Sequence, residues 1–303
     1  MNRPTPALRS VVAVENTLGA MTHARQHSIP VFLLNQWCRS DDGRLTAFRW
    51  VHGKFEMLPR PPTSVGWILH QYSLDRRDGT KDVSIEKEFL GPHVDNPAAV
   101  VHQKLLMNGL GSLSGEQFFC WAQFLASLLI RAPRMVAHLK ESGKTELVTS
   151  LEADPHAYEE IRGDAVEQTL LEWFEAHESW LLETFGTRML PGLIQRQDLL
   201  GYFLGSNTWI LRSFGLSKYD LLTCDQPLLH YGSVKDEYLF ALPLSPRVLF
   251  AVTNNARMEK SLRDASEDFL VKQLNLATVK RADRWVVGSD TSQGSFVRAH
   301  LPR

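Results

Sequence analysis

Cysteine is scarce in this sequence, and its spacing argues against two classes of protein. The 303 residues hold three cysteines, Cys38, Cys120 and Cys224, and no CxxC pair. An odd and widely spaced set argues against a disulfide framework and against a cysteine-rich zinc site. Such a set fits a reducing compartment, so we expect a cytoplasmic protein.

Long hydrophobic runs are also missing. The N-terminal residues MNRPTPALRS contain no continuous apolar stretch of the kind that a signal peptide needs. The most apolar run, Phe118 to Ile130, is shorter than the ~20 residues that cross a bilayer. We therefore expect no membrane span, and we expect this run to form a helix buried in the core.

Charge of one sign is not in excess. The 33 basic and 34 acidic residues leave a formal net charge of −1. This balance argues against binding of long nucleic acids by bulk charge, although it leaves room for a small basic cleft. Hydrophobic residues make up 44% and charged residues 22% of the chain, which are ordinary values for a globular protein with a large core.

Four common catalytic motifs are absent. The chain has no GxGxxG after a predicted strand, no GxxxxGK loop, no HExxH and no GxSxG. Dinucleotide enzymes, P-loop nucleoside triphosphatases, zincins and α/β-hydrolases therefore lose support.

Local patterns predict β structure near the start of the chain. The segment from Ile29 to Leu58 is predicted as extended. Within it, β-rich residues 45–50 and 54–57 flank a turn at Gly53, which predicts a hairpin. Prolines at 61 and 62 end this segment, because proline has no N–H for a strand ladder.

Helix signals fill residues 84–215. Helix starts are predicted at Asp95–Pro97, at the capping box Ser114–Gln117 and at Asp164–Glu167. Gly186 is predicted as a helix C-cap, because glycine accepts the left-handed conformation found there.

From Tyr219 the pattern returns to short β segments, with one long helix predicted over Met258–Ala282. Strands at both ends and helices between them predict an α+β fold: a mixed sheet built from N- and C-terminal strands, with a predominantly helical middle packed on it. We expect residues 1–22 to be a loosely held segment. Residues 23–303 are predicted to form a single α+β domain whose helical portion is 84–215.

Six short motifs follow one another in a distinctive order. They are His27–Leu34, Ile85–Lys87, Arg131–Pro133, Leu222–Pro227, Leu242–Pro246 and Asn275. Their order and spacing resemble those of the domain-of-unknown-function 4238 family of bacterial proteins over nearly the whole chain. Cys224 stands where that family usually has serine. The resemblance implies no substrate, and it associates the chain with conflict between bacteria and phage or with toxins.

Polar residues within these motifs are the candidate site residues. His27 would act as a general base or metal ligand, or would hydrogen-bond to a turn. Glu86 would be a functional-site residue, or its carboxylate would only be stabilised by the dipole of the helix that begins there. Asp225 would hold a metal or a base at a strand end, or would accept backbone N–H groups in an Asx-type turn.

Arg131 also has two interpretations. At the end of the buried helix it would clamp a phosphate or carboxylate, or would neutralise the helix-end carbonyls. Arg131 and His138 have an Arg-x6-His spacing reminiscent of the HEPN ribonucleases. Pro133 would disturb the helix on which such a pair needs to sit.

The first functional hypothesis is a metal-dependent phosphodiester hydrolase, a nuclease or nucleotide phosphodiesterase of bacterial defence. Glu86 and Asp225 would hold a divalent cation such as Mg²⁺ or Mn²⁺, His27 would move a proton, and Arg131 would meet the phosphate. The expected substrate is a nucleotide or a small or single-stranded nucleic acid.

The second hypothesis is a non-enzymatic binding or sensing module. Its partner surface would be rich in tryptophan, with Trp67, Trp180 and Trp209 as candidates. A catalytic thiol at Cys224 or Cys38 is a third reading, for which the sequence offers no activating environment.

Overall fold

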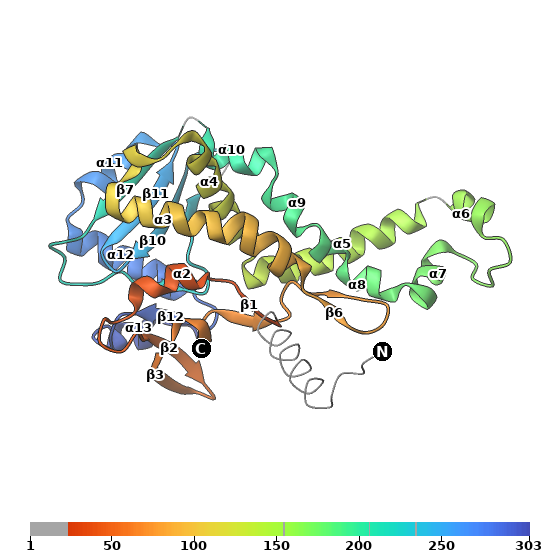
Figure 1. Ribbon diagram of the computed structural model, residues 1–303, viewed down its shortest axis with the longest axis horizontal. Coiled ribbons are helices and arrows are strands. Elements are labelled where there is room, and N and C mark those ends of the chain that lie inside the picture. The colour runs from red at the N-terminus through yellow and green to blue at the C-terminus, as the bar shows by residue number, and fades with distance from the viewer. Residues whose placement is uncertain (1–23, 154, 206, 234) are drawn as a thin grey trace, which may run out of the picture. The chain divides into compact units, whose positions relative to one another are not determined.

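The chain forms two compact units, each assembled from separate stretches. The computed structural model describes residues 24–153, 155–205, 207–233 and 235–303 (Figure 1). Unit 1 comprises the residues up to Gln26, Ile68–Gly91 and Pro133–Pro191, and unit 2 comprises His27–Trp67, Pro92–Ala132 and Gly192–Arg303. Residues 1–22, predicted as loosely held, lie outside the described residues. The prediction of one domain over 23–303 stays a prediction.

Unit 2 contains two four-stranded sheets. Its strands are β2 (Leu45–Val51), β3 (Lys54–Arg60), β7 (Thr208–Ser213), β8 (Thr223–Cys224), β9 (Leu229–Gly232), β10 (Tyr238–Ser245), β11 (Val248–Thr253) and β12 (Val286–Gly288). Its helices are α2 (Val31–Leu34), α3 (Asn96–Asn108), α4 (Gly115–Ile130), α10 (Gln197–Leu204), α11 (Ala256–Asp264), α12 (Glu267–Arg281) and α13 (Gly294–His300), with short 3-10 turns η1 (Asn35–Trp37), η2 (Pro62–Ser64) and η4 (Leu110–Ser112).

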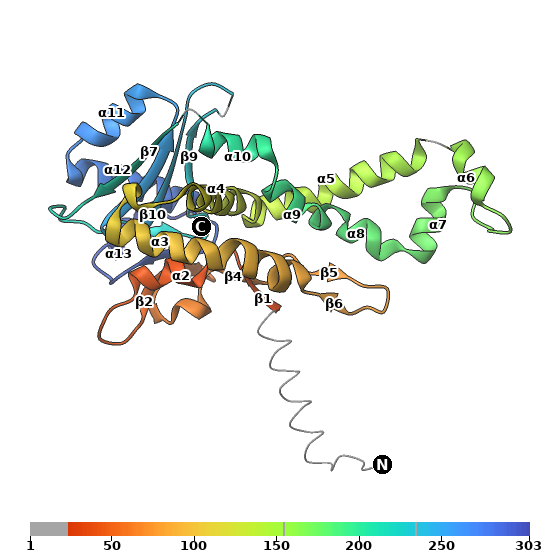
Figure 2. The ribbon, with the colours of Figure 1, turned by 45° about the horizontal axis from the view of Figure 1, so that its top comes forward.

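The first sheet has the order β7-β11-β10-β9 and lies between two layers of helices (Figure 2). Successive side chains of a strand point to opposite faces. On one face Ile210, Leu249 and Ala251 pack against apolar residues of α11 and α12. On the other face Phe250 contacts Trp121 of α4, with ring centroids 5.7 Å apart. Strands buried on both faces explain the nearly continuous apolar runs of this part of the sequence.

The second sheet, β3-β2-β12-β8, joins N-terminal to C-terminal strands. The hairpin predicted around Gly53 is confirmed as β2 and β3, and β12 pairs with both β2 and β8. Phe48, Val286 and Val297 share a core with Val279 of α12, so α12 contributes to the cores of both sheets. The α+β class and the sheet from both ends are confirmed. Neighbouring strands are antiparallel in both four-stranded sheets, and the C-terminal strands β7, β9, β10 and β11 form a sheet separate from the one that joins the two ends of the chain.

Unit 1 is mainly helical. Its elements are α5 (Pro133–Glu152), α6 (Pro155–Ile161), α7 (Leu170–His177), α8 (Ser179–Arg188) and the hairpin of β5 (Leu74–Asp75) with β6 (Lys81–Asp82). Helices α5 and α8 cross at Gly143 and Gly186, where the two backbones touch. Beside the crossing, Lys144 Nζ lies 2.5 Å from Glu183 Oε1. Where the chain passes between units it forms β1 (Arg25–His27), β4 (Trp67–Leu69), the π-helical η3 (Ile85–Asp95) and α9 (Leu190–Ile194).

Several local predictions are confirmed and others are wrong. The Ser114–Gln117 capping box opens α4, and the run from Phe118 lies within that helix. Val31–Leu34, predicted as extended, is one helical turn that follows Pro30, because a short apolar run does not distinguish strand from helix. The helix predicted over Met258–Ala282 is two helices, with Ser266 as the N-cap of α12. None of the helices in the described ranges has the length and apolarity to span a membrane.

Two predicted helix ends are also wrong. The helix expected at Asp164–Glu167 begins at Leu170, where Thr169 and Glu172 form a second capping box. Gly186 is not a C-cap, because α8 continues past it to Arg188. Its role is to let α5 approach, since an added Cβ would lie 1.7 Å from the carbonyl oxygen of Leu139.

Candidate functional site

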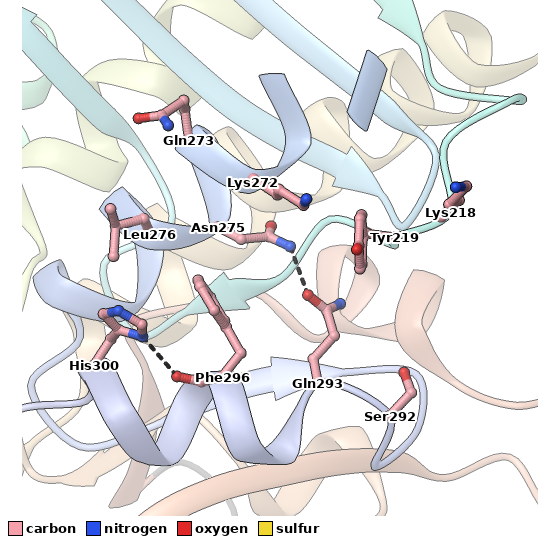
Figure 3. Close-up of a pocket in the computed structure, with 10 residues that line it drawn as sticks. All are labelled: Lys218, Tyr219, Lys272, Gln273, Asn275, Leu276, Ser292, Gln293, Phe296 and His300. Carbon is pink, nitrogen blue, oxygen red and sulfur yellow. Dashed lines mark hydrogen bonds between the residues drawn. The ribbon is translucent and has the colours of Figure 1, made fainter. Parts of the chain in front are cut away.

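A pocket of about 440 Å³ opens on unit 2 between α12, α13 and the loop before β8 (Figure 3). Its lining combines two lysines, one histidine, two aromatic rings and three side-chain amides, together with Leu276 and Ser292: Lys218, Lys272, His300, Tyr219, Phe296, Gln273, Asn275 and Gln293. Among these described lining residues there is no carboxylate. The lining is therefore cationic and partly aromatic.

The floor of this pocket is a pair of amides. Asn275 is 2% exposed and accepts a 2.9 Å hydrogen bond from the N–H of Leu222. Its Nδ2 donates at 2.8 Å to the carbonyl oxygen of Asp220 and to Gln293 Oε1, and Gln293 Nε2 donates at 2.8 Å to the same carbonyl. Asn275 thus ties α12 to the loop before β8 and to the start of α13 (Figure 3). Both N–H groups of the Asn275 side chain are occupied by these bonds, so Asn275 holds the pocket floor in place.

The rim carries the positive charge. Lys272 Nζ lies 4.8 Å from the centroid of the Tyr219 ring, a cation–π distance. The exposed Lys218 is held through its backbone, whose N–H donates to Asp268 Oδ1 at 2.8 Å. This hydrogen bond is the largest of the effects that hold the pKa of Asp268 below its usual range. The Lys272 ammonium group therefore stands over the Tyr219 ring, and the backbone of Lys218 is fixed beside it.

Asp225, the strand-end acid of the candidate set, anchors a loop. It is 4% exposed, and its carboxylate accepts three backbone N–H groups, from Asp283 at 2.9 Å, Arg284 at 2.6 Å and Trp285 at 3.2 Å. Its own N–H donates to the carbonyl oxygen of Trp285 at 3.2 Å. The carboxylate thus accepts backbone N–H groups, as the structural alternative predicts, but the donors belong to the segment before β12 and not to an Asx-type turn at Asp225.

The electrostatics of Asp225 follow from this geometry. Burial raises its pKa to about 6, against the effect of the N–H donors, which favour the charged form. A carboxylate offers about four acceptor positions, and three donors already occupy most of them. Asp225 therefore fits an anchoring role better than a metal-ligand role.

The neighbouring Cys224 is fully buried, and its Sγ donates to the carbonyl oxygen of Gln226 at 3.3 Å. Burial raises the pKa of this thiol far above its usual range. Since the thiolate is the reactive form, a buried neutral thiol gives the catalytic-thiol reading of Cys224 no support. For Cys38, burial likewise raises the thiol pKa.

Arg131 lies wholly buried at the C-cap of α4. Its Nη1 lies 2.9 Å and 3.0 Å from the two carboxylate oxygens of Asp95. Asp95, predicted to cap α3, makes no side-chain cap hydrogen bond. The pairing of Arg131 with a carboxylate explains how a guanidinium is accommodated in the core. His138 lies in α5, a helix that begins at Pro133, so the Arg-x6-His pair is not on one helix.

The remaining candidates lie on two other elements. His27 ends β1 in unit 2, and Glu86 is the second residue of η3 in unit 1. None of the four candidates, including Arg131 and Asp225, lines the pocket of Figure 3. In the part of the chain that the structure describes, no group of three or more His, Cys, Asp or Glu forms a metal-binding arrangement. The Glu86–Asp225 metal site stays a prediction.

The tryptophans of the alternative hypothesis are partly structural. Trp209 packs against Phe250, with ring centroids 5.0 Å apart, and its indole N–H donates to the carbonyl oxygen of Phe203 at 2.7 Å. It belongs to the layer between the first sheet and α10. Trp180 lies in unit 1 with Arg188 5.3 Å from its ring centroid. The half-buried Trp209 therefore contributes to packing, and the tryptophan-rich partner surface stays a prediction.

Sequence reasoning missed most of the pocket. Lys218, Tyr219, Lys272 and Phe296 carry no motif, and only Asn275 was singled out, through the resemblance. The pocket exists because α13 packs beside α12, and no local pattern encodes that contact. The lining residues come from separate segments of the sequence, so the lack of acidic residues among them can be recognised only in the folded structure.

The fold and this pocket define an α+β protein whose pocket between α12 and α13 has a cationic and partly aromatic lining. Comparison with known families places residues 25–292 within the family described as protein of unknown function (DUF4238), and the chain belongs to that family. The predicted resemblance is confirmed. No curated protein and no solved structure matches the chain.

Proposed function

We propose that the protein binds a phosphate-bearing aromatic small molecule, of the nucleotide class, in the pocket between α12 and α13. The observation that carries this proposal is the composition of the lining: Lys218, Lys272 and His300 around Tyr219 and Phe296, without a carboxylate among the described lining residues. A volume of about 440 Å³ lies within the ~300–1,000 Å³ of typical small-molecule sites.

Each part of the ligand has a partner in this arrangement. The ammonium groups of Lys218 and Lys272 would meet phosphate oxygens as point charges. The rings of Tyr219 and Phe296 stand on either side of the amide pair in Figure 3 and would stack on a base. The amide of Gln293, held by Asn275, would read a hydrogen-bonding edge.

Hydrolysis of this ligand is the finer part of the proposal. For that reaction the sequence predicts His27, Glu86, Arg131 and Asp225 with a divalent cation, and none of these four residues lines the pocket proposed to bind the ligand. The anchoring of Asp225 and the ion pair of Arg131 support structural roles for these two residues, so binding is the better-supported half. A cytoplasmic location and a part in bacterial defence belong to the proposal on the strength of the sequence alone.

Substitution of Lys272 tests the binding proposal. Lys272→Ala is expected to weaken nucleotide binding about tenfold, because one charge-assisted contact to phosphate is lost. Isothermal titration with adenosine and guanosine mono- and triphosphates measures the effect. Lys280→Ala is the matched control, since Lys280 is exposed on the same helix and does not line the pocket.

Two outcomes count against these proposals separately. Equal affinity of Lys272→Ala and Lys280→Ala would remove the pocket from the binding site. Retention of intact nucleotide and dinucleotide after incubation with Mg²⁺ or Mn²⁺, at concentrations that saturate binding, would refute hydrolysis and leave a binding module.

A further inference from the structure

A second pocket of about 340 Å³ lies on unit 2 between the end of β2, the loop before β12 and the segment after α13. Arg49, Trp50, Arg284, Trp285 and Arg303 form most of its lining. Three guanidinium groups and two indoles are thus gathered from three distant parts of the sequence. The chain's overall charge balance gave no sign of this local concentration.

Arginine and tryptophan are stacked in two pairs. The guanidinium carbon of Arg49 lies 4.5 Å from the centroid of the Trp285 ring, and that of Arg303 lies 5.0 Å from the Trp50 ring. Nη2 of Arg49 also lies 3.0 Å from Glu56 Oε2, and this ion pair fixes the plane of the Arg49 guanidinium group. Stacked guanidinium groups keep N–H donors at their edges for a phosphate while the indoles offer flat apolar surface.

The pocket is held in shape before any ligand arrives. The three N–H bonds to Asp225 fix the backbone of residues 283–285, from which Arg284 and Trp285 project. The indole N–H of Trp50 donates to the carbonyl oxygen of Leu301 at 3.2 Å. Asp283, the one acidic side chain among the described residues of this lining, accepts a hydrogen bond from Gln226. Asp225 is thereby a positioning residue for this site.

The two pockets are lined by consecutive residues. Phe296 and His300 of α13 line the first pocket, and Leu301, Pro302 and Arg303 line the second. A ligand that extends past the end of α13 would therefore meet both. Both linings combine aromatic rings with cationic side chains, which is the combination that binds bases and phosphates of single strands.

We propose that the arginine–tryptophan pocket binds one nucleotide unit of a short single-stranded nucleic acid whose neighbouring part occupies the first pocket. The proposal rests on the nucleotide binding proposed above for the first pocket. It names the physiological ligand as an oligonucleotide, RNA or DNA. The indoles stack on bases, and Arg284 and Arg49 contact phosphate.

Fluorescence anisotropy with labelled ten-nucleotide oligo-U and oligo-dT tests this assignment on the full-length protein. The oligonucleotides are expected to bind at least about tenfold more tightly than the mononucleotides. Arg284→Ala is expected to weaken oligonucleotide binding about fivefold to tenfold and to lower the slope of log K against log salt concentration by about 0.7. Mononucleotide affinity at the first pocket should not change.

The controls separate loss of contact from loss of fold. Arg298→Ala removes an exposed arginine of α13 that lines neither pocket, and it should leave the affinity unchanged. Trp285→Ala should weaken oligonucleotide binding, and Trp285→Phe, which keeps a ring for stacking, should restore most of it. Melting temperatures of all variants identify any that do not fold, and the exposed Arg284 keeps the test open if Trp285→Ala is one of them.

The outcomes distinguish this inference from the function on which it rests. Oligonucleotides that bind no better than mononucleotides, or equal effects of Arg284→Ala and Arg298→Ala, overturn the second site and leave the first. Mononucleotides that fail to bind, with oligonucleotide binding still dependent on Arg284, overturn the first-pocket proposal and support the second site. Equal competition by polyphosphate or an acidic peptide overturns nucleic-acid recognition at both.

Discussion

Asp225→Ala is expected to lower the free energy of unfolding by about 3 kcal/mol or more, because it leaves backbone N–H groups of three consecutive residues without their acceptor. Each unsatisfied buried donor costs about 1–3 kcal/mol, and relaxation of the loop limits the sum. Urea denaturation followed by circular dichroism measures the change. The loss should also loosen residues 283–285 and with them the arginine–tryptophan pocket.

A matched control is Asp290→Ala. Asp290 is exposed and accepts one backbone N–H, from Ser292 at 2.8 Å, so its removal is expected to cost about 1 kcal/mol or less. If Asp225→Ala kept full stability and abolished an activity, the anchoring interpretation would fail and a catalytic acid would be the better account.

The pH dependence of Asp225 has a defined sign. Its pKa is about 6 in the folded protein, above the ~3.9 of an unfolded aspartate, so the folded state binds the proton more tightly between these values. The stability that Asp225 contributes is therefore fully present below about pH 4 and declines as pH rises to about 6. Relative to Asp225→Asn, which does not titrate, the free energy of unfolding of the wild-type protein should fall by roughly 2–3 kcal/mol across this window.

Urea denaturation of both proteins at pH 4, 5, 6, 7 and 8 tests this prediction, since other titrating groups cancel in the difference. A difference that does not change with pH would show that the carboxylate is charged throughout.

Gly186→Ala is expected to disrupt unit 1. An added Cβ would lie 1.7 Å from the carbonyl oxygen of Leu139 and 3.1 Å from the Cα of Lys140, both backbone atoms of α5. Backbone in a helix cannot move aside as a flexible side chain does, so the two helices must separate. We expect a loss of about 3 kcal/mol or more, beyond the usual 1–3 kcal/mol of overpacking, and increased proteolysis of α5 and α8.

Gly201→Ala provides the comparison. Gly201 lies within α10, and an added Cβ there meets nothing within 4 Å. This substitution should raise stability by roughly 0.5–1 kcal/mol, because alanine is the better helix former. Similar losses for both glycines would mean that α5 and α8 do not cross at Gly186 as described.

Local chemistry explains which predictions of the fold succeeded. The Ser114–Gln117 capping box and the hairpin at Gly53 each depend on a few residues close in sequence, and both are present. The helix start predicted at Asp164–Glu167 was wrong. Thr169 and Glu172, five residues further on, form the reciprocal capping bonds, and the helix begins there. The prediction of a helix end at Gly186 was wrong for a different reason. A glycine that allows two helices to pack closely cannot be distinguished, in the sequence alone, from a glycine that ends a helix in the left-handed conformation.

The candidate site was less accessible to sequence reasoning. Asp225 was identified as an acid at a strand end, and the choice between ligand and anchor depended on residues 283–285, which are about 60 positions away. Arg131 and Asp95 each belong to a predicted helix end, and no pattern in the sequence pairs them, whereas they form an ion pair in the structure. The two pockets gather Lys218 with Lys272 and Arg49 with Arg284, and these pairs have no local spacing that marks them.

The sequence by itself determined the α+β class, the family, the buried helix from Phe118 and the strands from both ends that share a sheet. These follow from periodicity and from turn and cap chemistry, which act over a few residues. Only the tertiary structure decided that Asp225 anchors a loop, that Gly186 serves a helix crossing, and that cationic and aromatic side chains meet around α13. Those features depend on long-range packing, in which burial and neighbouring charge set the chemistry of each side chain.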